Sequence, residues 1–359
     1  MLLPQKADGD TSGRGTTDAP GAPAGAMTIL ITGATGLVGR ALAQSLLDQG
    51  ADVRVVTRRP HRVLEAFNSS RLSAFEWHPR TEPLLPEALE GVERIVHLMG
   101  EPIYGAATRE GRRRISESRR IAATRLAEAL GRHRVHFIVA SSASVYGFGQ
   151  GPLVSEFAGD LPRSKNKLVR ALRTAEQTAE QIAANGSTVT IVRLGLVIAP
   201  GGFIEPLRQL HAAGLTWNAP HPDATNPTVI PAIDLEDAVT LLAWLARARR
   251  VAGPVNAVAP EPLRSGDLKA LLEEAAPRRV RIPLPRMLLR RYIGTLADVV
   301  YGRQPVAPER LMKEAGFEFQ HPHPNDSVHA VLAHHAEAAA AARPARKRGS
   351  LLAGVVQKG

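Results

Sequence analysis

Hydrophobic positions along the first 200 residues follow two spacings in turn, and this alternation predicts both helices and strands. Apolar residues recur at helical spacing in the stretches Arg40–Leu47, Ile115–Leu130 and Leu168–Ala184. Short apolar runs that predict buried strands separate them, at Thr28–Ile31, Asp52–Thr57, Arg94–Met99, Val135–Ala140 and Thr188–Leu194. Strands that alternate with helices are typical of a parallel sheet covered on both faces, so we predict an α/β fold with a doubly wound parallel sheet.

The pattern loosens beyond about residue 200, where proline and glycine become frequent, and this change divides the chain into expected domains. We expect residues 27–200 to form one domain and residues 201–333 to form a smaller, mixed C-terminal lobe that completes a pocket. Residues 1–26 are rich in Gly, Pro, Ala, Thr and Asp, so we predict a disordered extension, with Met27 as a hypothesis for the native start. Residues 334–359 are alanine-rich and then basic, and we predict a disordered basic tail.

The charge and the composition narrow the classes of function. Lysine and arginine number 45 against 34 aspartates and glutamates, a formal net charge of +11. The cations of the tail have no aromatic residues between them, so a stacking platform for single strands is missing and nucleic acid is not expected as a partner. The lack of cysteine excludes a disulfide framework and thiolate chemistry, and it fits a cytoplasmic location. No apolar run reaches about 18 residues, so we expect no membrane-spanning helix.

Two groups of histidine and aromatic residues give little support for a ligand site. His321 and His323 are split by a proline, and no acidic cluster completes a site beside them or beside His334-His335, so we predict no metal. Trp77-His78 follows a predicted third strand, where a core or rim aromatic is favoured over a contact with adenine.

A glycine turn follows the first predicted strand at once. Gly33, Gly36 and Gly39 are spaced GxxGxxG between a strand and a helix, inside a unit of strand, helix and strand. Such glycines allow a tight turn, the approach of a diphosphate to the backbone and close packing of the helix on the sheet. We therefore predict a Rossmann-type dinucleotide site, with Thr35, Leu37 and Val38 as further contacts near the helix start. The alternative is a glycine turn with a purely structural role.

The end of the second predicted strand distinguishes between cofactors. An acidic residue there would accept hydrogen bonds from the ribose hydroxyls, but this chain has Thr57-Arg58-Arg59. A guanidinium suits a 2′-phosphate in charge and shape. We predict NADP(H) in preference to NAD(H), with Thr57 and Arg58 as contacts; the alternative is that both arginines point to solvent.

Several blocks of the sequence resemble the extended, epimerase-like branch of the short-chain dehydrogenase/reductase superfamily. The glycine turn is shared by the whole superfamily. More specific blocks are similar to the "epimerase family protein" group, which carries a C-terminal domain of unknown function. They are Val55–Pro60, Leu98–Ile103, Arg193–Val197, Gly253–Pro262, Ala297-Asp298, Gly302–Val306 and Gly316–Phe319. The resemblance covers about Met27–Leu332.

The resemblance implies an NADP-binding domain over 27–200 and a lobe that holds the substrate. It implies that Leu98, Met99 and Gly100 pass beside the adenosine or the diphosphate. It also implies that Arg119 faces the cofactor and that Leu196 lies near the nicotinamide. Ordinary packing, or a surface cation in the case of Arg119, is the alternative for each.

The resemblance also places catalytic residues, with one departure. Ser142 would hydrogen-bond the substrate oxygen, the alternative being a capping or turn serine. The superfamily uses a tyrosine with a lysine four residues later, and none of Tyr104, Tyr146, Tyr292 and Tyr301 has one. Tyr146, Lys165 or Lys167 could still supply the proton by another geometry, or substrate or water could. Tyr146 is the catalytic candidate that we retain, although a pocket wall is its commoner role.

Two hypotheses about function follow. The first is an NADP-dependent epimerase-like enzyme or oxidoreductase acting on an unknown small molecule, with nucleotide sugars and carbonyl compounds as candidates. The second is a non-catalytic NADP-binding sensor or regulatory scaffold, which the missing tyrosine–lysine pair favours. Relatives commonly have Trp-Ile-His-Ile-Asp-Asp where this chain has Pro231–Asp237, which weakens any inference of substrate from the family. A homodimer is a further expectation.

Overall fold

The computed structural model describes residues 27–101, 109–148, 153–158, 161, 164–218, 227–247 and 251–341. The predicted extension at 1–26, the tail from residue 342 onward and Tyr104 lie outside the described residues.

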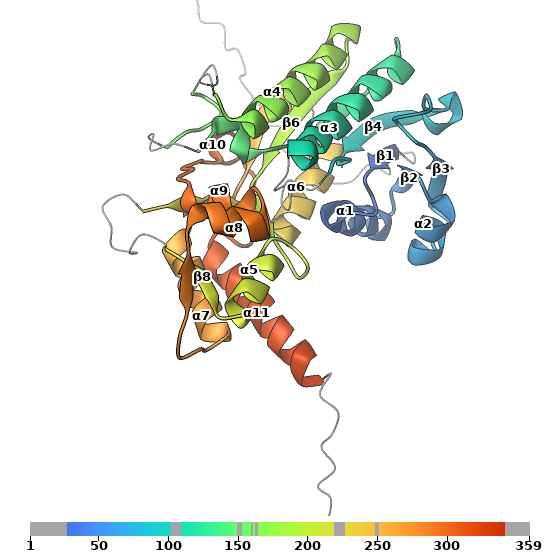
Figure 1. The fold of residues 1–359 in the computed structure, drawn as a ribbon. Helices are drawn as coiled ribbons and strands as arrows, with labels where there is room; N and C mark the ends of the chain where they lie inside the picture. Colours follow the sequence, from blue (N-terminus) through green and yellow to red (C-terminus); the bar gives the residue numbers. More distant parts are fainter. Residues whose placement is uncertain are drawn as a thin grey trace, which may run out of the picture.

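Seven parallel strands form the central sheet (Figure 1). They are β1 (Thr28–Thr32), β2 (Asp52–Thr57), β3 (Leu72–Glu76), β4 (Val92–His97), β5 (His136–Ser142), β6 (Thr188–Leu194) and β11 (Gly253–Ala257). Their order across the sheet is β11-β6-β5-β4-β1-β2-β3, with every pairing parallel. The order reverses between β1 and β4, which is where doubly wound sheets open a crevice at the carboxyl ends of their strands. The predicted Rossmann-type fold is confirmed.

Helices cover both faces of this sheet (Figure 1). On one face, α1 (Leu37–Asp48) packs against α6 (Leu235–Arg247), and α2 (Pro60–Phe67) lies beside β3. On the other face, α3 (Arg109–Leu130) packs along α4 (Lys167–Glu180). The strands are buried from both sides, which explains why they read in the sequence as short, nearly continuous apolar runs.

The last strand of the sheet comes from beyond residue 200. Strand β11 pairs in parallel with β6, with Val255 opposite Val192, and it buries Val255 and Ala257 in the same core as α1 and α6. Without β11, the edge of β6 would present unpaired backbone groups. The chain therefore returns to the layered domain after residue 200, which corrects the expectation that residues 201–333 form only the smaller lobe.

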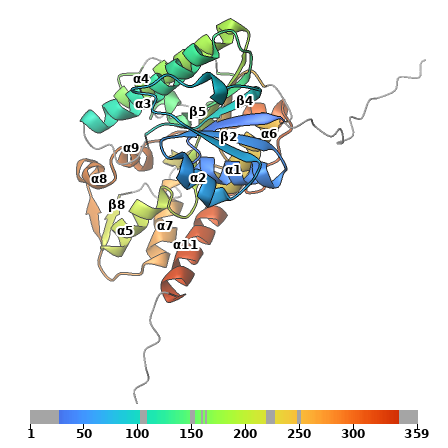
Figure 2. The same ribbon diagram turned by 90° about the vertical axis from the view of Figure 1, so that its right-hand side faces the viewer.

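The smaller lobe has its own core around Phe203 and Trp217, beneath the carboxyl ends of the central strands (Figure 2). Its strands are β7 (Leu196–Ile198), β8 (Leu215–Trp217), β9 (Val229–Ile230), β10 (Ala232–Asp234), β12 (Leu263–Arg264) and β13 (Ile282–Leu284), paired two by two. Its helices are α5 (Ile204–Ala212), α7 (Ser265–Ala275), α8 (Arg286–Ile293), α9 (Leu296–Tyr301) and α11 (Pro324–Ala341). Helix α10 (Glu309–Lys313) packs against β11 instead, so it belongs with the sheet.

Helix α11 includes residues that we predicted to be disordered. It continues to Ala341 and buries Val328, Val331 and Leu332 in the core of the lobe. Alanine has the strongest intrinsic preference for helix, so an alanine-rich stretch that follows an anchored turn extends it. The prediction of disorder was wrong for residues 334–341. Over the residues that the structure describes, no helix combines the length and apolar character needed to cross a membrane.

Candidate functional site

The glycine turn between β1 and α1 brings three elements into close approach. Gly33 has φ +78°, and its carbonyl oxygen accepts a hydrogen bond from the Gly36 N–H at 3.0 Å. A Cβ atom at Gly33 would lie 2.9 Å from the backbone of Leu98 and Met99, beyond the end of β4. A Cβ atom at Gly39 would collide with the carbonyl oxygen of Gly33. Gly33 and Gly39 are therefore needed to pack the turn against β4 and α1.

The start of α1 is open to a ligand. Gly36 is its N-cap and has extended backbone, and within the described residues no side chain caps the first turn. That turn carries no acidic residue either. Free N–H groups and the positive end of the helix dipole suit a phosphate, so the arrangement fits the diphosphate of a dinucleotide.

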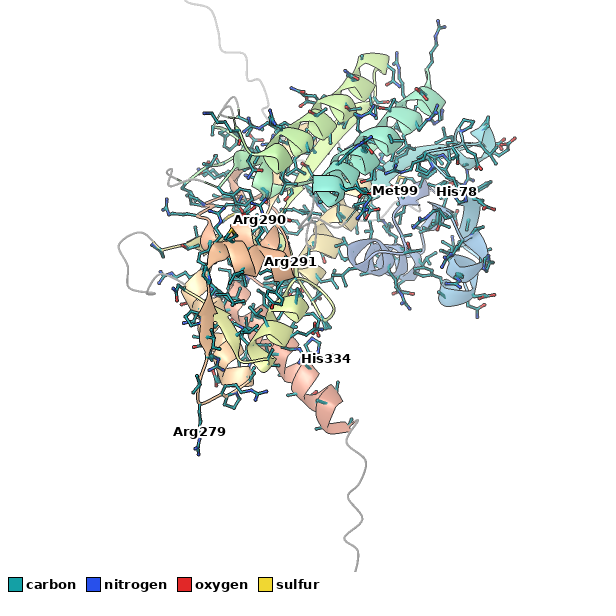
Figure 3. All side chains as sticks on the ribbon, viewed as in Figure 1. His78, Met99, Arg279, Arg290, Arg291 and His334 are labelled. Atoms are coloured by element: carbon teal, nitrogen blue, oxygen red, sulfur yellow. The ribbon has the colours of Figure 1, made fainter. Side chains whose placement is uncertain are left out.

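A cavity of about 500 Å³ opens in front of this turn, at the carboxyl ends of β1, β2 and β4. Figure 3 labels two of its wall residues, His78 after β3 and Met99 after β4. Its lining residues are Gly33, Ala34, Thr35, Gly36, Val56, Thr57, Arg58, His78, Pro79, Arg80, Thr81, Leu98, Met99, Gly100, Glu101, Ser118 and Ile121. A volume of this size is typical of small-molecule and cofactor sites.

The cavity unites eight of the residues that we predicted to bind the cofactor. They are Gly33, Thr35, Gly36, Thr57, Arg58, Leu98, Met99 and Gly100. Leu37, Val38 and Gly39 continue from the turn into α1, and Gly39 packs behind it. The described lining does not include Arg119 or Leu196.

Arg119 packs against Gly100, one of the residues that line the cavity. A Cβ atom at Gly100 would lie 2.8 Å from its Cζ atom, and its Nη1 donates hydrogen bonds to the carbonyl oxygens of Glu101, at 2.9 Å, and Ile115, at 3.2 Å. Arg119 thus holds the segment after β4 against α3. Leu196 is buried in the core of the smaller lobe, on β7.

A buried polar pair fixes the end of β4 against β1. The Oγ1 atom of Thr32 lies 2.7 Å from Nδ1 of His97 and accepts a hydrogen bond from the Met99 N–H at 3.3 Å. Burial, helped by the charge of Arg119, lowers the pKa of His97 to about 3, so its ring is neutral at physiological pH. The sequence analysis missed this pair. The only hint of it in the sequence was that a polar residue, threonine or histidine, ends each of two otherwise apolar strands.

The wall of the cavity formed after β3 and by α3 was also largely missed. His78, Arg80 and Thr81 follow β3, and Ser118 and Ile121 come from α3. Trp77 is fully buried in the core, as the favoured interpretation had it, whereas His78 lines the cavity. Since the carboxyl ends of adjacent parallel strands meet at one edge, the residues after β3 could have been expected here.

Neither predicted catalytic residue belongs to the described lining of this cavity. The Oγ atom of Ser142 is the N-cap of a short 3₁₀ turn, Ala143–Tyr146, and accepts the Ser144 N–H at 3.2 Å. This is the capping geometry that we gave as the alternative. Its catalytic role remains a prediction.

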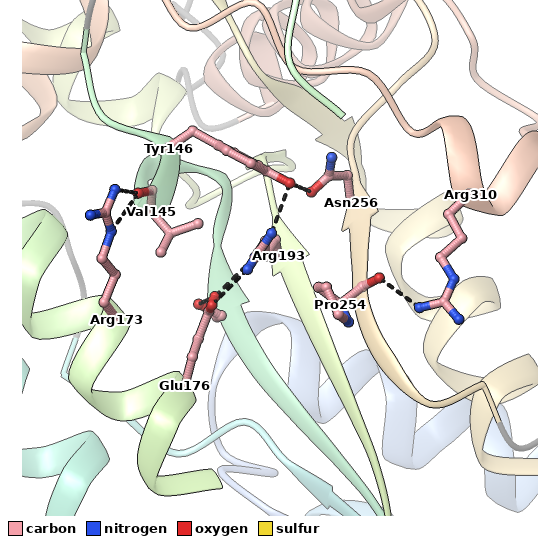
Figure 4. Close-up of polar contacts among 9 residues, drawn as sticks. Val145, Tyr146, Arg173, Glu176, Arg193, Pro254, Asn256 and Arg310 are labelled. Atoms are coloured by element: carbon pink, nitrogen blue, oxygen red, sulfur yellow. Dashed lines mark hydrogen bonds and ion pairs between the residues drawn. The ribbon is translucent and has the colours of Figure 1, made fainter. Parts of the chain in front are cut away.

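Tyr146 belongs to a polar network at the ends of β5, β6 and β11 (Figure 4). Its hydroxyl donates to Oδ1 of Asn256 at 2.9 Å and accepts from Nη1 of Arg193 at 2.8 Å. Arg193 also donates to both carboxylate oxygens of Glu176, at 3.1 and 2.9 Å. Burial raises the pKa of Tyr146, against the opposing charge of Arg193. A cation does reach this tyrosine, but it comes from β6 and is paired with a carboxylate.

Comparison with known protein families agrees with this geometry. Residues 29–214 match the model of the NAD dependent epimerase/dehydratase family, a span that contains the glycine turn, the cavity, strands β2 to β6 and all of β1 but its first residue. The chain belongs to this family. The resemblance stated from the sequence is confirmed.

Two curated relatives extend the match beyond the sheet. An epimerase family protein SDR39U1 homolog of Arabidopsis thaliana, described as chloroplastic, is 27% identical over 313 residues, covering 85% of this chain and 87% of the relative. The epimerase family protein Mb2239 of Mycobacterium bovis is 28% identical over 301 residues, covering 82% of this chain and 93% of the relative. Both alignments therefore include most of the smaller lobe.

Solved structures share the fold. Human epimerase family protein SDR39U1, solved with NADPH, superposes with a TM-score of 0.64 at 20% identity, covering 86% of this chain and 99% of the human chain. UDP-glucose 4-epimerase of Thermotoga maritima, solved with UDP-glucose, gives a TM-score of 0.68 at 18% identity, covering 87% and 100%. At these identities the likeness establishes the architecture.

Proposed function

We propose that the protein binds NADP(H) in the cavity at the glycine turn and works as an epimerase-like enzyme or oxidoreductase on a small molecule. The observation that carries this proposal is the cavity itself. It lies at the point where the strand order reverses, beside an uncapped helix start and close-packed glycines. Family membership supports the same reading.

Arg58 supports the preference for NADP(H) over NAD(H). It follows β2, lines the cavity and is exposed, and no described acidic residue forms an ion pair with it. The human relative was solved with NADPH, whereas other neighbours of the same fold were solved with NAD. The charge of Arg58 is what would distinguish the two cofactors in this chain.

This chain's own residues would hold the cofactor as follows. The N–H groups at the start of α1, in Leu37 and Val38, bind the diphosphate. Leu98, Met99 and Gly100 line the opposite wall, kept in place by Arg119 and by the Thr32–His97 pair. When bound, the nicotinamide supplies the hydride that is exchanged with the substrate.

For the chemical step, Ser142 would hydrogen-bond the substrate oxygen and Tyr146 would hold a proton on its hydroxyl. A raised pKa keeps the Tyr146 hydroxyl protonated at neutral pH, so it would act as a proton donor, although as a weaker acid than an ordinary tyrosine. The candidate substrates are nucleotide sugars and carbonyl compounds. The non-catalytic sensor remains the second candidate, because the Arg193–Glu176 pair already engages the tyrosine.

The test uses the full-length protein and calorimetric titration with NADPH and NADH. We expect NADPH to bind more tightly, and Arg58→Ala to weaken NADPH alone. The matched control is Arg62→Ala, an exposed arginine of α2 outside the described lining. NADPH consumption is then screened across sugar nucleotides, aldehydes and ketones. Binding without turnover on any of them would favour the sensor, and no binding of either nucleotide would refute the proposal.

A further inference from the structure

The adenosine side of the cavity carries a second arginine. Arg58 follows β2, and Arg80 lies four residues beyond the end of β3, the neighbouring strand. Both line the same cavity, and the side chain of Arg80 is 53% exposed. Two arginines that follow adjacent strands therefore line the same cavity.

The turn that carries Arg80 is firmly anchored. Trp77 is fully buried, its N–H donates to the carbonyl oxygen of Thr57 at 3.0 Å, and its indole Nε1 donates to the carbonyl oxygen of Glu82 at 3.3 Å. Within the turn, the N–H groups of Thr81 and Glu82 both donate to the carbonyl oxygen of His78, at 3.0 and 2.9 Å. The backbone of Arg80 is thus placed at the rim, while its exposed side chain keeps freedom to reach a ligand.

Arg80 is only loosely paired with Glu117, because Glu117 forms a closer ion pair with Arg113. The Nη1 atom of Arg80 lies 4.0 Å from Oε2 of Glu117 on α3. The other carboxylate oxygen of Glu117 accepts a hydrogen bond from Nε of Arg113 at 2.5 Å. If Arg80 moved to another anion, Glu117 would keep Arg113, so the exchange would cost no more than one exposed ion pair.

We propose that Arg80 binds the 2′-phosphate of the cofactor together with Arg58, and that Glu117 competes with this phosphate for Arg80. The proposal rests on the proposed function and deepens it. A 2′-phosphate has several acceptor oxygens and can be bound by two guanidinium groups at once, each with charge-assisted hydrogen bonds. Glu117 lowers the affinity for the phosphate by repelling it and by holding Arg80 toward α3.

The two substitutions should act in opposite directions. Arg80→Gln removes one charged contact with the phosphate, and we expect the Kd of NADP⁺ to rise about tenfold, corresponding to about 1.4 kcal/mol. Glu117→Gln removes the competitor, and we expect the Kd of NADP⁺ to fall by a few-fold, the scale of one exposed ion pair. The Kd of NAD⁺, which has no 2′-phosphate, should stay unchanged in both variants.

The experiment is calorimetry on the full-length protein with NADP⁺, NAD⁺, adenosine 2′,5′-bisphosphate and adenosine 5′-monophosphate. Arg62→Gln is the control for the loss of one surface charge, and circular dichroism checks that each variant is folded. If wild-type protein binds NADP⁺ and Arg80→Gln leaves the NADP⁺ to NAD⁺ ratio unchanged, only this inference fails. If wild-type protein binds none of the four nucleotides, the proposed function fails as well. An unchanged NADP⁺ affinity in Glu117→Gln would overturn the competition.

Discussion

Arg193 donates two hydrogen bonds to the carboxylate of Glu176, and the two side chains are only 8% and 6% exposed. The pair joins β6 to α4 and also reaches the Tyr146 hydroxyl and, through Glu176, the Ser141 hydroxyl. Removing either side chain would leave the other charge buried without a partner, and a single buried charge destabilises the fold far more than a buried pair does. This pair therefore organises the strand ends next to the predicted catalytic residues.

Breaking that pair should destabilise the fold. Glu176→Gln leaves the charge of Arg193 without its carboxylate, and we expect the free energy of unfolding to fall by about 3–5 kcal/mol in urea denaturation. The double variant Glu176→Leu with Arg193→Met removes both charges and should lose less. Equal midpoints for Glu176→Gln and wild type would contradict this account.

Tyr146→Phe separates the structural role of the tyrosine from a catalytic one. If the hydroxyl donates the proton, turnover should drop by about 10²–10⁴-fold while NADPH affinity is unchanged. Burial raises the pKa of Tyr146 above its ordinary value of 10.0, so the phenolate should appear only at higher pH. The measurement is the ultraviolet difference titration of wild type against the variant. A phenolate that forms below pH 10.0 would show that Arg193 dominates instead.

His97 should make stability depend on pH in acid. Its pKa is lowered from 6.5 to about 3 in the folded state, so between these values the unfolded chain binds the additional proton. Stability should therefore fall as the pH drops through this window, by up to about 1.4 kcal/mol per pH unit. His97→Gln should lose this part of the slope, whereas the exposed control His61→Gln should keep it. Parallel pH profiles for His97→Gln and wild type would contradict the assignment.

Two glycines of the turn should respond differently to alanine. A Cβ atom at Gly39 would collide with the carbonyl oxygen of Gly33, so Gly39→Ala should lower the melting temperature. At Gly36 the Cβ atom would lie 3.3 Å from that oxygen, and φ is −81°, so Gly36→Ala should fold. We expect it to lose NADPH affinity because the methyl group obstructs the diphosphate. Tight NADPH binding by folded Gly36→Ala would place the diphosphate elsewhere.

The sequence by itself determined the alternating elements, the glycine turn and the cation after β2. Each of these is a local pattern, because a buried strand, an amphipathic helix and a positive-φ turn all follow from residues close together in the chain. Gly33, Gly36 and Arg58 therefore lie where they were predicted, at one end of the sheet.

Only the tertiary structure decided which distant segments meet there. β11 joins β6 across about sixty residues, Arg80 and Arg58 line the same cavity, and Arg193, paired with Glu176, donates a hydrogen bond to Tyr146. No local sequence pattern signals these contacts. Each depends on the order of strands in the sheet and on which polar groups must pair once they are buried. The surroundings of Ser142 and Tyr146 depend on those long-range contacts, which is why residues of the cavity could be predicted from the sequence and the partners of Tyr146 could not.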